Sequence, residues 1–356
     1  MEMISSISPA EAVAAVMLLA LVAYALLGGA DYGAGVWDLL ARGPRAEAQR
    51  ELIAHAIGPV WEANHVWLII VIVLLFTGFP LAFATVMTSL HVPLSLMLVG
   101  IVLRGSAFTF RSYDNVTGKH RWNQLFSVPS VVTPILLGTV IGAIATGNPG
   151  RAVISGGPIP LFNTWLQPFP LVVGLFALTI FAFLAAVYLT LETTDPLLQE
   201  DFRTRALLAA VVLGGVAWVV YLLARRDAPL LFGGLSGSPW GIPVRYATGA
   251  FAIATLASLG FRWFSLARLT AMAQVALILW GCALAQYPLL VPPEIDVDHG
   301  AAPAVVQKIL LIVLGGGSLV LLPSLYYLFH IFKGHTFHTH HRDETSGAAN
   351  FRGRKS

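Results

Sequence analysis

Runs of about 20 apolar residues follow one another along almost the whole chain. A helix of about 20 residues crosses a bilayer core of roughly 30 Å, so each run has the length of a membrane span. Only 11% of the residues are charged, whereas a soluble domain has about 25%. Transmembrane strands would instead give short segments of alternating polarity. The sequence therefore predicts an all-α, polytopic membrane protein.

The apolar pattern predicts nine transmembrane helices, joined mostly by short connections. We expect them at about residues 10–40, 52–78, 81–111, 126–147, 165–194, 203–224, 244–262, 267–288 and 305–332. Residues 1–332 would form one transmembrane domain, built as two four-helix bundles plus one extra helix. Charged residues near corresponding helix ends allow 10–147 and 165–288 to be repeats, although inner helix ends are commonly basic in any case. Residues 333–356 form a tail rich in histidine and arginine.

Lysine and arginine are distributed unequally between two sets of loops. If the N-terminus is outside, 15 of the 21 basic residues lie in cytoplasmic segments and four in outer loops. Cytoplasmic loops of membrane proteins carry such an excess. The sequence therefore predicts a periplasmic N-terminus and a cytoplasmic C-terminal tail. The net charge of +3 is spread over the loops, so it does not suggest nucleic acid.

Three charged residues fall inside the first three predicted helices. Asp31 precedes Arg42 by 11 residues, and Glu62 follows Arg50 by 12. At about 1.5 Å per residue, both acids lie some 15 Å from the cytoplasmic loop. Arg104 falls in the same half of the membrane, so we expect Asp31 to face Glu62 and Arg104. Charges within a bilayer are costly and usually mark a pathway; the alternative is an ion pair that only holds the helices together.

The two acids outnumber the one base, which favours Glu62 as a functional residue. A surplus carboxylate in a medium of low dielectric constant binds a proton more readily, and this suits proton transfer. Asn64 and His65 follow within one helical turn and could relay protons, or could simply be hydrogen-bonded. A haem-ligand role for His65 is disfavoured because no second histidine is placed to pair with it.

Small residues predict where the helices approach one another closely. Gly29 and Gly33 form a Gly-x-x-x-Gly pair, as do Gly138 and Gly142. Such pairs let helix backbones come into contact. Asp38 lies nearer the cytoplasmic interface, and we expect it to be solvated.

Three stretches together resemble subunit II of the cytochrome bd-type quinol oxidases, including the cyanide-insensitive members. They are GADYGAG near the end of the first helix, GPVWEANHVWL in the second and LRGSAFTFR in the third. The resemblance is specific over about residues 25–125. It implies a haem-free subunit in the bacterial inner membrane that supports a haem-bearing subunit I. It also implies that the subunit lends an acid to a cytoplasmic proton route toward the oxygen-reducing haem.

The resemblance assigns roles to individual residues of this chain. Glu62, after Trp61, takes the position of the proton-route acid, which is Asp in many relatives. Asp31 matches the acid of the glycine-rich stretch, and Arg104 and Arg111 match the two arginines at the end of the third helix. Trp67 belongs to the same stretch as Trp61, and both are expected to serve packing. No catalytic, haem-binding or metal-binding residue is expected in this chain.

The resemblance also implies partners. Haem b and haem d, or haem b alone, would lie in subunit I, and the quinol would be ubiquinol or menaquinol. Small single-helix accessory subunits and a structural quinone or lipid are compatible with the family. Two other functions stay open from the residues alone. One is a proton-coupled secondary transporter, favoured by the possible repeat and the buried charges; the other is a purely structural membrane subunit.

Overall fold

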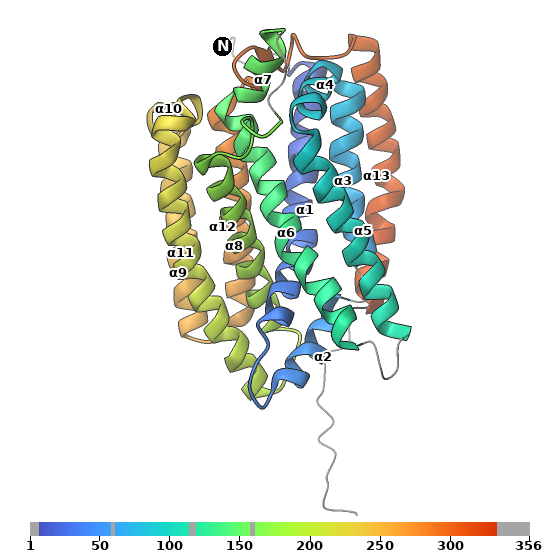
Figure 1. Cartoon of the computed structure of the whole chain (residues 1–356), viewed down its shortest axis with the longest axis vertical. Helices are drawn as coiled ribbons and strands as arrows, with labels where there is room; N and C mark the ends of the chain where they lie inside the picture. Colours follow the sequence, from blue (N-terminus) through green and yellow to red (C-terminus); the bar gives the residue numbers. More distant parts are fainter. Residues whose placement is uncertain (1–6, 58–60, 114–118, 157–160, 333–356) are drawn as a thin grey trace, which may run out of the picture.

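The computed structural model describes residues 7–57, 61–113, 119–156 and 161–332. Almost all of them are helical, and the long helices run side by side along one axis of the molecule (Figure 1). The all-α prediction is therefore confirmed. The elements are α1 Pro9–Leu39, α2 Ala46–Ile57, α3 Trp61–Gly78, α4 Pro80–Ser89, α5 His91–Tyr113, α6 Lys119–Thr146, α7 Asn148–Ile154, α8 Pro168–Leu189, α9 Pro196–Asp227, α10 Pro229–Gly237, α11 Gly241–Gly260, α12 Phe264–Gln286, β1 Leu289–Val291, β2 Ile295–Asp296 and α13 Ala304–Phe332.

Eight of the described helices are long and apolar enough to cross a membrane, and α2 with α3 make a ninth if this bent pair is one span. The prediction of about nine spans agrees with this range. The axes of α2 and α3 differ by 54°, so the single helix expected at 52–78 is two. The helix expected at 81–111 is also divided, into α4 and α5, because Pro93 cannot bond to the carbonyl of Ser89 and its ring collides with that group.

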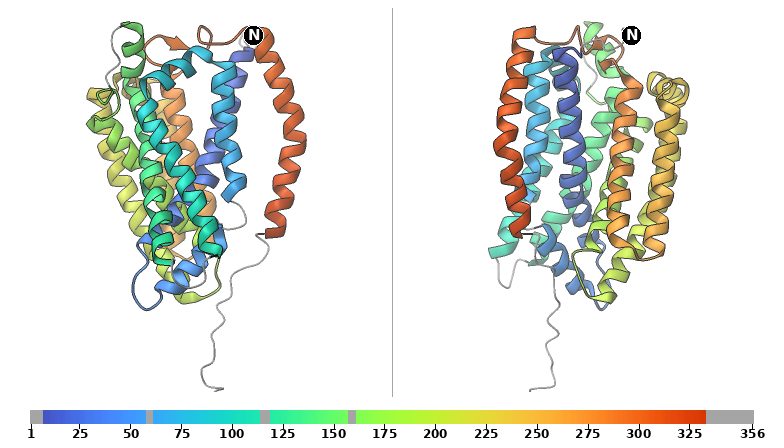
Figure 2. Two further views of the ribbon diagram at one scale, coloured as in Figure 1. Left: turned by 45° about the vertical axis from the view of Figure 1, so that its right-hand side comes forward. Right: turned by 180° about the vertical axis from the view of Figure 1, so that it is seen from behind.

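The long helices form two groups of four. One group comprises α1, α3, α5 and α6, and the other comprises α8, α9, α11 and α12. Helix α8 packs against α1 and α6 and so joins the groups, while α13 lies along α1 and α3 at one side (Figure 2). The arrangement agrees with the expected two bundles and one extra helix. We call the end of the molecule that carries α2 the α2 end, and the opposite end, with α7 and the β1–β2 hairpin, the hairpin end (Figure 1).

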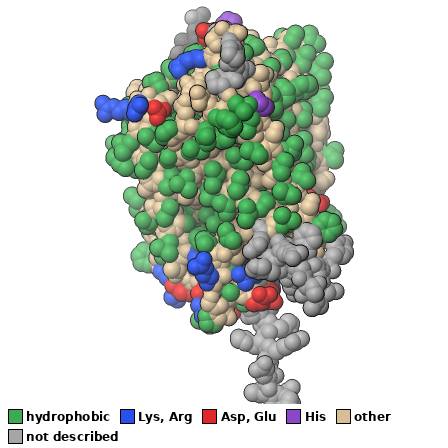
Figure 3. All heavy atoms as spheres, in the orientation of Figure 1, with side chains coloured by type: hydrophobic (Ala, Val, Ile, Leu, Met, Phe, Trp, Pro, Cys, Tyr) green, Lys and Arg blue, Asp and Glu red, His purple; other side chains and the backbone are tan. Residues whose placement is uncertain are grey.

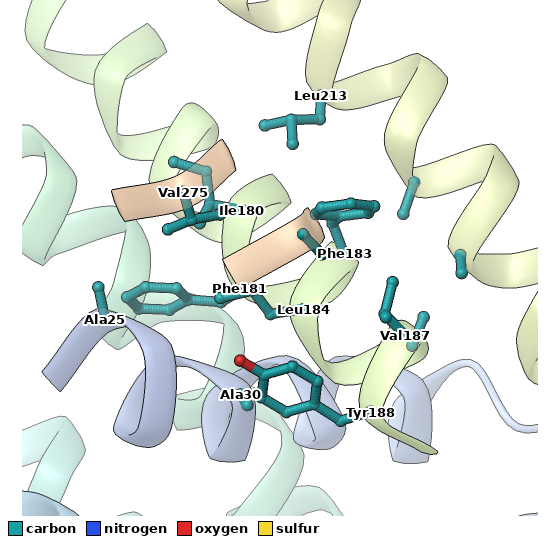
Figure 4. Packing of buried hydrophobic residues seen from close by; sticks show 14 of the residues in the cluster. Ala25, Ala30, Ile180, Phe181, Phe183, Leu184, Val187, Tyr188, Leu213 and Val275 are labelled. Carbon is teal, nitrogen blue, oxygen red and sulfur yellow. The ribbon is translucent and has the colours of Figure 1, made fainter. Parts of the chain in front are cut away.

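Glycines on α1 allow the two groups to meet. A Cβ atom added at Gly29 would lie 2.5 Å from the ring of Phe181 on α8, and one added at Gly33 would collide with the backbone carbonyl of Phe181. Gly138 and Gly142 on α6 face the first turns of α8 in the same way. Around these contacts, apolar side chains of α1, α8, α9 and α12 form the largest core (Figure 4). The close backbone contact fixes where the charged part of α1 lies.

The face of the molecule seen in Figure 3 is a broad apolar band with charged side chains gathered toward both ends. Helix α13 is the least covered, since only 6% of its most apolar window is buried. A surface of this kind suits lipid or another apolar protein face, not water. The charged residues inside the bundle therefore stand out against an apolar background.

Candidate functional site

Asp31 of α1 and Arg104 of α5 lie together inside the first helix group, toward the α2 end. Both are buried, with 6% and 2% of their surface exposed. Nη2 of Arg104 donates to the backbone carbonyl of Asp31 at 2.9 Å. The depths counted from the sequence therefore bring these two residues into contact, as expected.

The Arg104 guanidinium is held on several sides. Its Nε donates to Oγ of Ser130 at 3.2 Å, and its central carbon lies 4.5 Å from the ring centre of Tyr32. The ring of Phe126 on α6 lies 5.2 Å from the same carbon. Cation–π contacts of this kind are strongest where water is excluded. The guanidinium thus links α1, α5 and α6 at one depth.

Asn64 of α3 is the hydrogen-bond partner of the Asp31 side chain. Its Nδ2 donates to Oδ2 of Asp31 at 2.6 Å, and Asn64 is itself buried. Oδ1 of Asn64 and Nε1 of Trp67 are buried too, with no hydrogen-bond partner among the described residues. Buried polar atoms of this kind commonly bind internal water. The cluster therefore offers hydrogen-bonding atoms to internal water in addition to the bonds between its own side chains.

His65 is half-buried beside this cluster. Its ring centre lies 6.3 Å from that of Tyr24 and 6.4 Å from that of Tyr32. His65 thus sits among aromatic rings of α1, next in sequence to the asparagine that holds Asp31. The side chains of Trp61 and Arg111, to which the sequence assigned packing, lie outside the described residues.

Glu62 does not join the cluster. Its side chain is exposed in the first turn of α3, and it makes no hydrogen bond or ion pair with the part of the chain that the structure describes. The reason is helix geometry: Asn64 is two positions after Glu62, which is a rotation of about 200° around the helix axis. Because Asn64 points inward to Asp31, Glu62 points outward. The structure brings Asp31 to Arg104 and Asn64, but not to Glu62.

Asp38 differs from its expected position. We expected a solvated carboxylate, but Asp38 has only 2% of its surface exposed and accepts a hydrogen bond from Oγ of Ser127 at 3.1 Å. The prediction was wrong because Ser127, inside the helix expected at 126–147, packs against the last turn of α1. A depth counted along one helix does not show which neighbouring helix covers a side chain.

A polar network that the sequence did not predict ties α2 to α9. Arg45 holds the Asp201 carboxylate with Nε at 2.8 Å and Nη2 at 2.5 Å. Gln49 donates to the same carboxylate at 2.8 Å and accepts from Arg205 at 2.7 Å. The Asp201 carboxylate raises the pKa of Arg45. The network fixes α2 against the first turns of α9 at the α2 end.

The arrangement can hold charge and exchange protons. Asp31 supplies a buried carboxylate, Arg104 a permanent cation, and Asn64 and His65 polar groups between them and the start of α3. Among the described residues, no group of three His, Cys, Asp or Glu could hold a metal ion. The described part of the chain therefore presents a charged polar cluster, not a metal centre.

Comparison with known proteins gives a consistent set of relatives. The family model described as cytochrome bd terminal oxidase subunit II matches residues 10–332. The cytochrome bd-I ubiquinol oxidase subunit 2 of Escherichia coli K12 is 29% identical over 216 residues, which are 56% of this chain and 54% of that protein. The cytochrome bd ubiquinol oxidase subunit 2 of Bacillus subtilis 168 is 30% identical over 36% of this chain and 38% of its own length. The match therefore spans about half the length of the E. coli relative and less of the B. subtilis one.

A solved structure shares the fold over nearly the whole chain. It is titled as the structure of bd oxidase from Geobacillus thermodenitrificans, and its matching chain superposes with a TM-score of 0.77. The match covers 91% of this chain and 98% of that chain, at 22% sequence identity. At this identity the likeness concerns the arrangement of helices.

Proposed function

The chain belongs to the cytochrome bd terminal oxidase subunit II family, and we propose that it acts as the second subunit of a quinol oxidase. The complex would oxidise quinol and reduce dioxygen to water, and this chain would not be active alone. The family match over residues 10–332 and the curated relatives, which are named as ubiquinol oxidase subunits, support the proposal. Ubiquinol or menaquinol would be the substrate.

The haems are assigned to the partner, subunit I. The described residues contain no cluster of metal-binding side chains, and the one histidine beside the charged cluster, His65, has aromatic neighbours. In this proposal the chain supports the haem-bearing subunit and supplies protons to it. Small accessory subunits and a structural quinone or lipid stay compatible with this role.

Glu62 is proposed as the acid that passes protons to the partner. Ile69, Val73 and Phe76 lie 7, 11 and 14 residues further along α3, and all three are exposed on the same stripe of the helix as Glu62. A carboxylate facing lipid hydrocarbon would cost several kcal/mol. It is acceptable where another protein surface supplies polar groups or water. This exposed acid on an apolar stripe is the observation that carries the proposal.

Asn64, Asp31 and His65 would form the inner part of the route. Asn64 lies on the opposite side of α3 and is hydrogen-bonded to Asp31, so the start of this helix connects an outward acid with a buried one. Water on the unpartnered atoms of Asn64 and Trp67 would extend the route. The lysines and arginines of the sequence favour a cytoplasmic α2 end, so protons would enter there.

Replacing Glu62 by Gln tests the proposal. The change keeps the size of the side chain and removes its proton exchange, so we expect quinol-dependent oxygen consumption to fall about tenfold or more. Assembly and the haem spectrum should stay normal. Glu51→Gln, at an exposed position of α2, is the matched control and should keep full activity. Full activity of a normally assembled Glu62→Gln complex would exclude the proton-route role and favour a structural subunit.

Purification from the native membrane separates the oxidase from the transporter alternative. A tagged chain extracted in mild detergent should carry a second large hydrophobic subunit with haem bands in a reduced-minus-oxidised spectrum. A colourless chain without partners, isolated from intact membranes, would instead favour proton-coupled transport with Glu62 as the coupling site.

A further inference from the structure

A second arginine is embedded at the hairpin end of the other helix group. Arg245 lies in the second turn of α11 and is half-buried. Its Nη1 donates to the hydroxyl of Tyr221 on α9 at 3.1 Å, and its guanidinium carbon lies 5.7 Å from the centre of that ring. The Tyr221 hydroxyl also shares a hydrogen bond of 2.9 Å with Oγ of Ser236 on α10. Three helices thus place one cation and two hydroxyl groups together.

The positive charge of Arg245 is not balanced within the described chain. Its Nε is buried with no hydrogen-bond partner there, and no described carboxylate lies within 4.0 Å of the guanidinium. The acid at the end of α9, Asp227, lies 3.7 Å from Arg226 instead, and Arg225 adds a further exposed cation. An embedded guanidinium needs an anion or strong acceptors to complete its hydrogen bonds. The charge of this half-buried guanidinium is therefore left without a counter-ion in the described part of the chain.

Aromatic side chains around Arg245 indicate its depth in the membrane. Trp240 and Tyr246 flank it in sequence and are 70% and 77% exposed, and Trp218 stacks on Tyr221 with ring centres 6.0 Å apart. Exposed tryptophan and tyrosine gather where acyl chains meet lipid headgroups. In Figure 1, α10 marks the same level at the hairpin end of the bundle. At this depth the anion available in quantity is the phosphate of a phospholipid.

We propose that Arg245, Tyr221 and Ser236 bind the headgroup phosphate of an anionic phospholipid in the leaflet at the hairpin end. The guanidinium would donate to the phosphate from its terminal nitrogens, and whichever of the two hydroxyl groups does not donate to the other would add a further hydrogen bond. The exposed apolar side chains of Leu222 and Ile242 flank the cluster and would contact the acyl chains. These chains are the reason to assign a lipid and not free phosphate. The inference is independent of the oxidase proposal.

The test uses the full chain in mild detergent, together with any proteins that co-purify with it. Detergent washing first removes the bound lipid. Phosphatidylglycerol is titrated into the micelles, and bound lipid is counted by native mass spectrometry while the unfolding temperature is recorded. Arg245→Gln should weaken phosphatidylglycerol binding about tenfold, since it removes a charge-assisted contact. Arg226→Gln is the matched control: its side chain is 90% exposed, and it should change binding less than about twofold.

Further variants and ligands keep the proposal open to refutation. Arg245→Lys preserves the positive charge but lacks the planar guanidinium group, so it should weaken phosphatidylglycerol binding only a few-fold. This variant replaces Arg245→Gln in the test if Arg245→Gln does not fold. Equal stabilisation by phosphatidylcholine would overturn the proposal by showing that acyl chains suffice. Equal stabilisation by inorganic phosphate would overturn it in favour of a soluble anion. Unchanged binding in both Arg245 variants, or equal loss in Arg226→Gln, would also overturn it.

Discussion

Two embedded arginines in this molecule lie over tyrosine rings but differ in burial and in how their hydrogen bonds are completed. Arg104, in the first helix group, is 4.5 Å from the ring centre of Tyr32, and Arg245, in the second group, is 5.7 Å from that of Tyr221. Arg104 is buried, donates to a backbone carbonyl and to a serine, and lies beside the acid Asp31. Arg245 is half-buried and has no carboxylate within 4.0 Å among the described residues.

The difference indicates what each arginine is for. A guanidinium whose partners belong to its own chain stabilises the fold, and removing one partner leaves the other charge buried alone. A guanidinium whose partners are missing from its chain is ready to bind something else. We therefore expect Arg104 to act as a structural centre for the charged cluster, and Arg245 to act as a binding residue. The predictions below test this contrast, from the largest expected effect to the smallest.

Arg104→Leu should have the largest effect. The change leaves the backbone carbonyl of Asp31 and the hydroxyl of Ser130 without their donor and removes the cation beside a buried acid, which should destabilise the protein by about 3 kcal/mol. We expect little folded protein in the membrane, measured as the yield and unfolding temperature of the tagged chain. Arg226→Leu, at a fully solvated position, is the control and should change neither. Normal yield and stability of Arg104→Leu would show that the fold does not depend on this guanidinium.

Asp31→Asn should have a smaller effect, because it removes the charge but keeps the backbone carbonyl that Arg104 uses. The effects of the two changes should also be coupled, because each single change leaves the other charged side chain without its neighbour. The double variant with Arg104→Leu should therefore be destabilised by about 1 kcal/mol or more less than the sum of the two single variants. Unfolding temperatures of the three variants give this coupling. Additive effects would mean that Asp31 and Arg104 are neighbours without electrostatic dependence.

The sequence predicted the meeting of Asp31 and Arg104 because depth in a membrane can be counted. Each helical residue advances about 1.5 Å, so distances from the basic loops placed both residues at one level. The direction of a side chain around its helix is harder to predict, because it depends on where the helix starts and how it rotates. The break between α2 and α3 interrupts that phase. For this reason Glu62 could be placed in depth but not in direction, and Asn64 is the residue that meets Asp31.

Contacts between distant segments were beyond the sequence. Arg45 and Asp201 are 156 residues apart, and nothing in either neighbourhood marks the pair. Arg245 was counted only as one of a few basic residues in outer loops, because its relation to Tyr221 and Ser236 requires three helices to converge. Composition and periodicity predict which residues lie in the membrane, but packing decides which charges find partners.

The pair of Asp296 and His299 should show the smallest effect, since the His299 side chain is 85% exposed and water compensates its charge. The Asp296 carboxylate accepts from the amide of His299 at 2.7 Å and contacts its ring Nδ1 at 2.6 Å. The backbone amide and then the ring of His299 lower the pKa of Asp296, and the Asp296 carboxylate raises the pKa of His299. The pair therefore holds the loop after β2 only while the acid is ionised and the histidine is protonated.

The sign of the pH dependence follows for each partner. The contribution of His299 is fully present below its ordinary pKa of 6.5 and is lost as pH rises through the raised value. The contribution of Asp296 is present above its ordinary pKa of 3.8 and is lost as pH falls through the lowered value. Amide exchange of Asp298 and His299 should thus be slowest, after correction for intrinsic rates, between these limits and faster above neutral pH. His299→Gln should abolish the change in amide exchange above neutral pH. The same change in that variant would show that the ion pair does not order this loop.

The effect of the pair on global stability should be within the small range of exposed ion pairs. That outcome would complete the contrast, because a pair compensated by water contributes little, whereas Arg104, compensated by protein, should be indispensable to the fold.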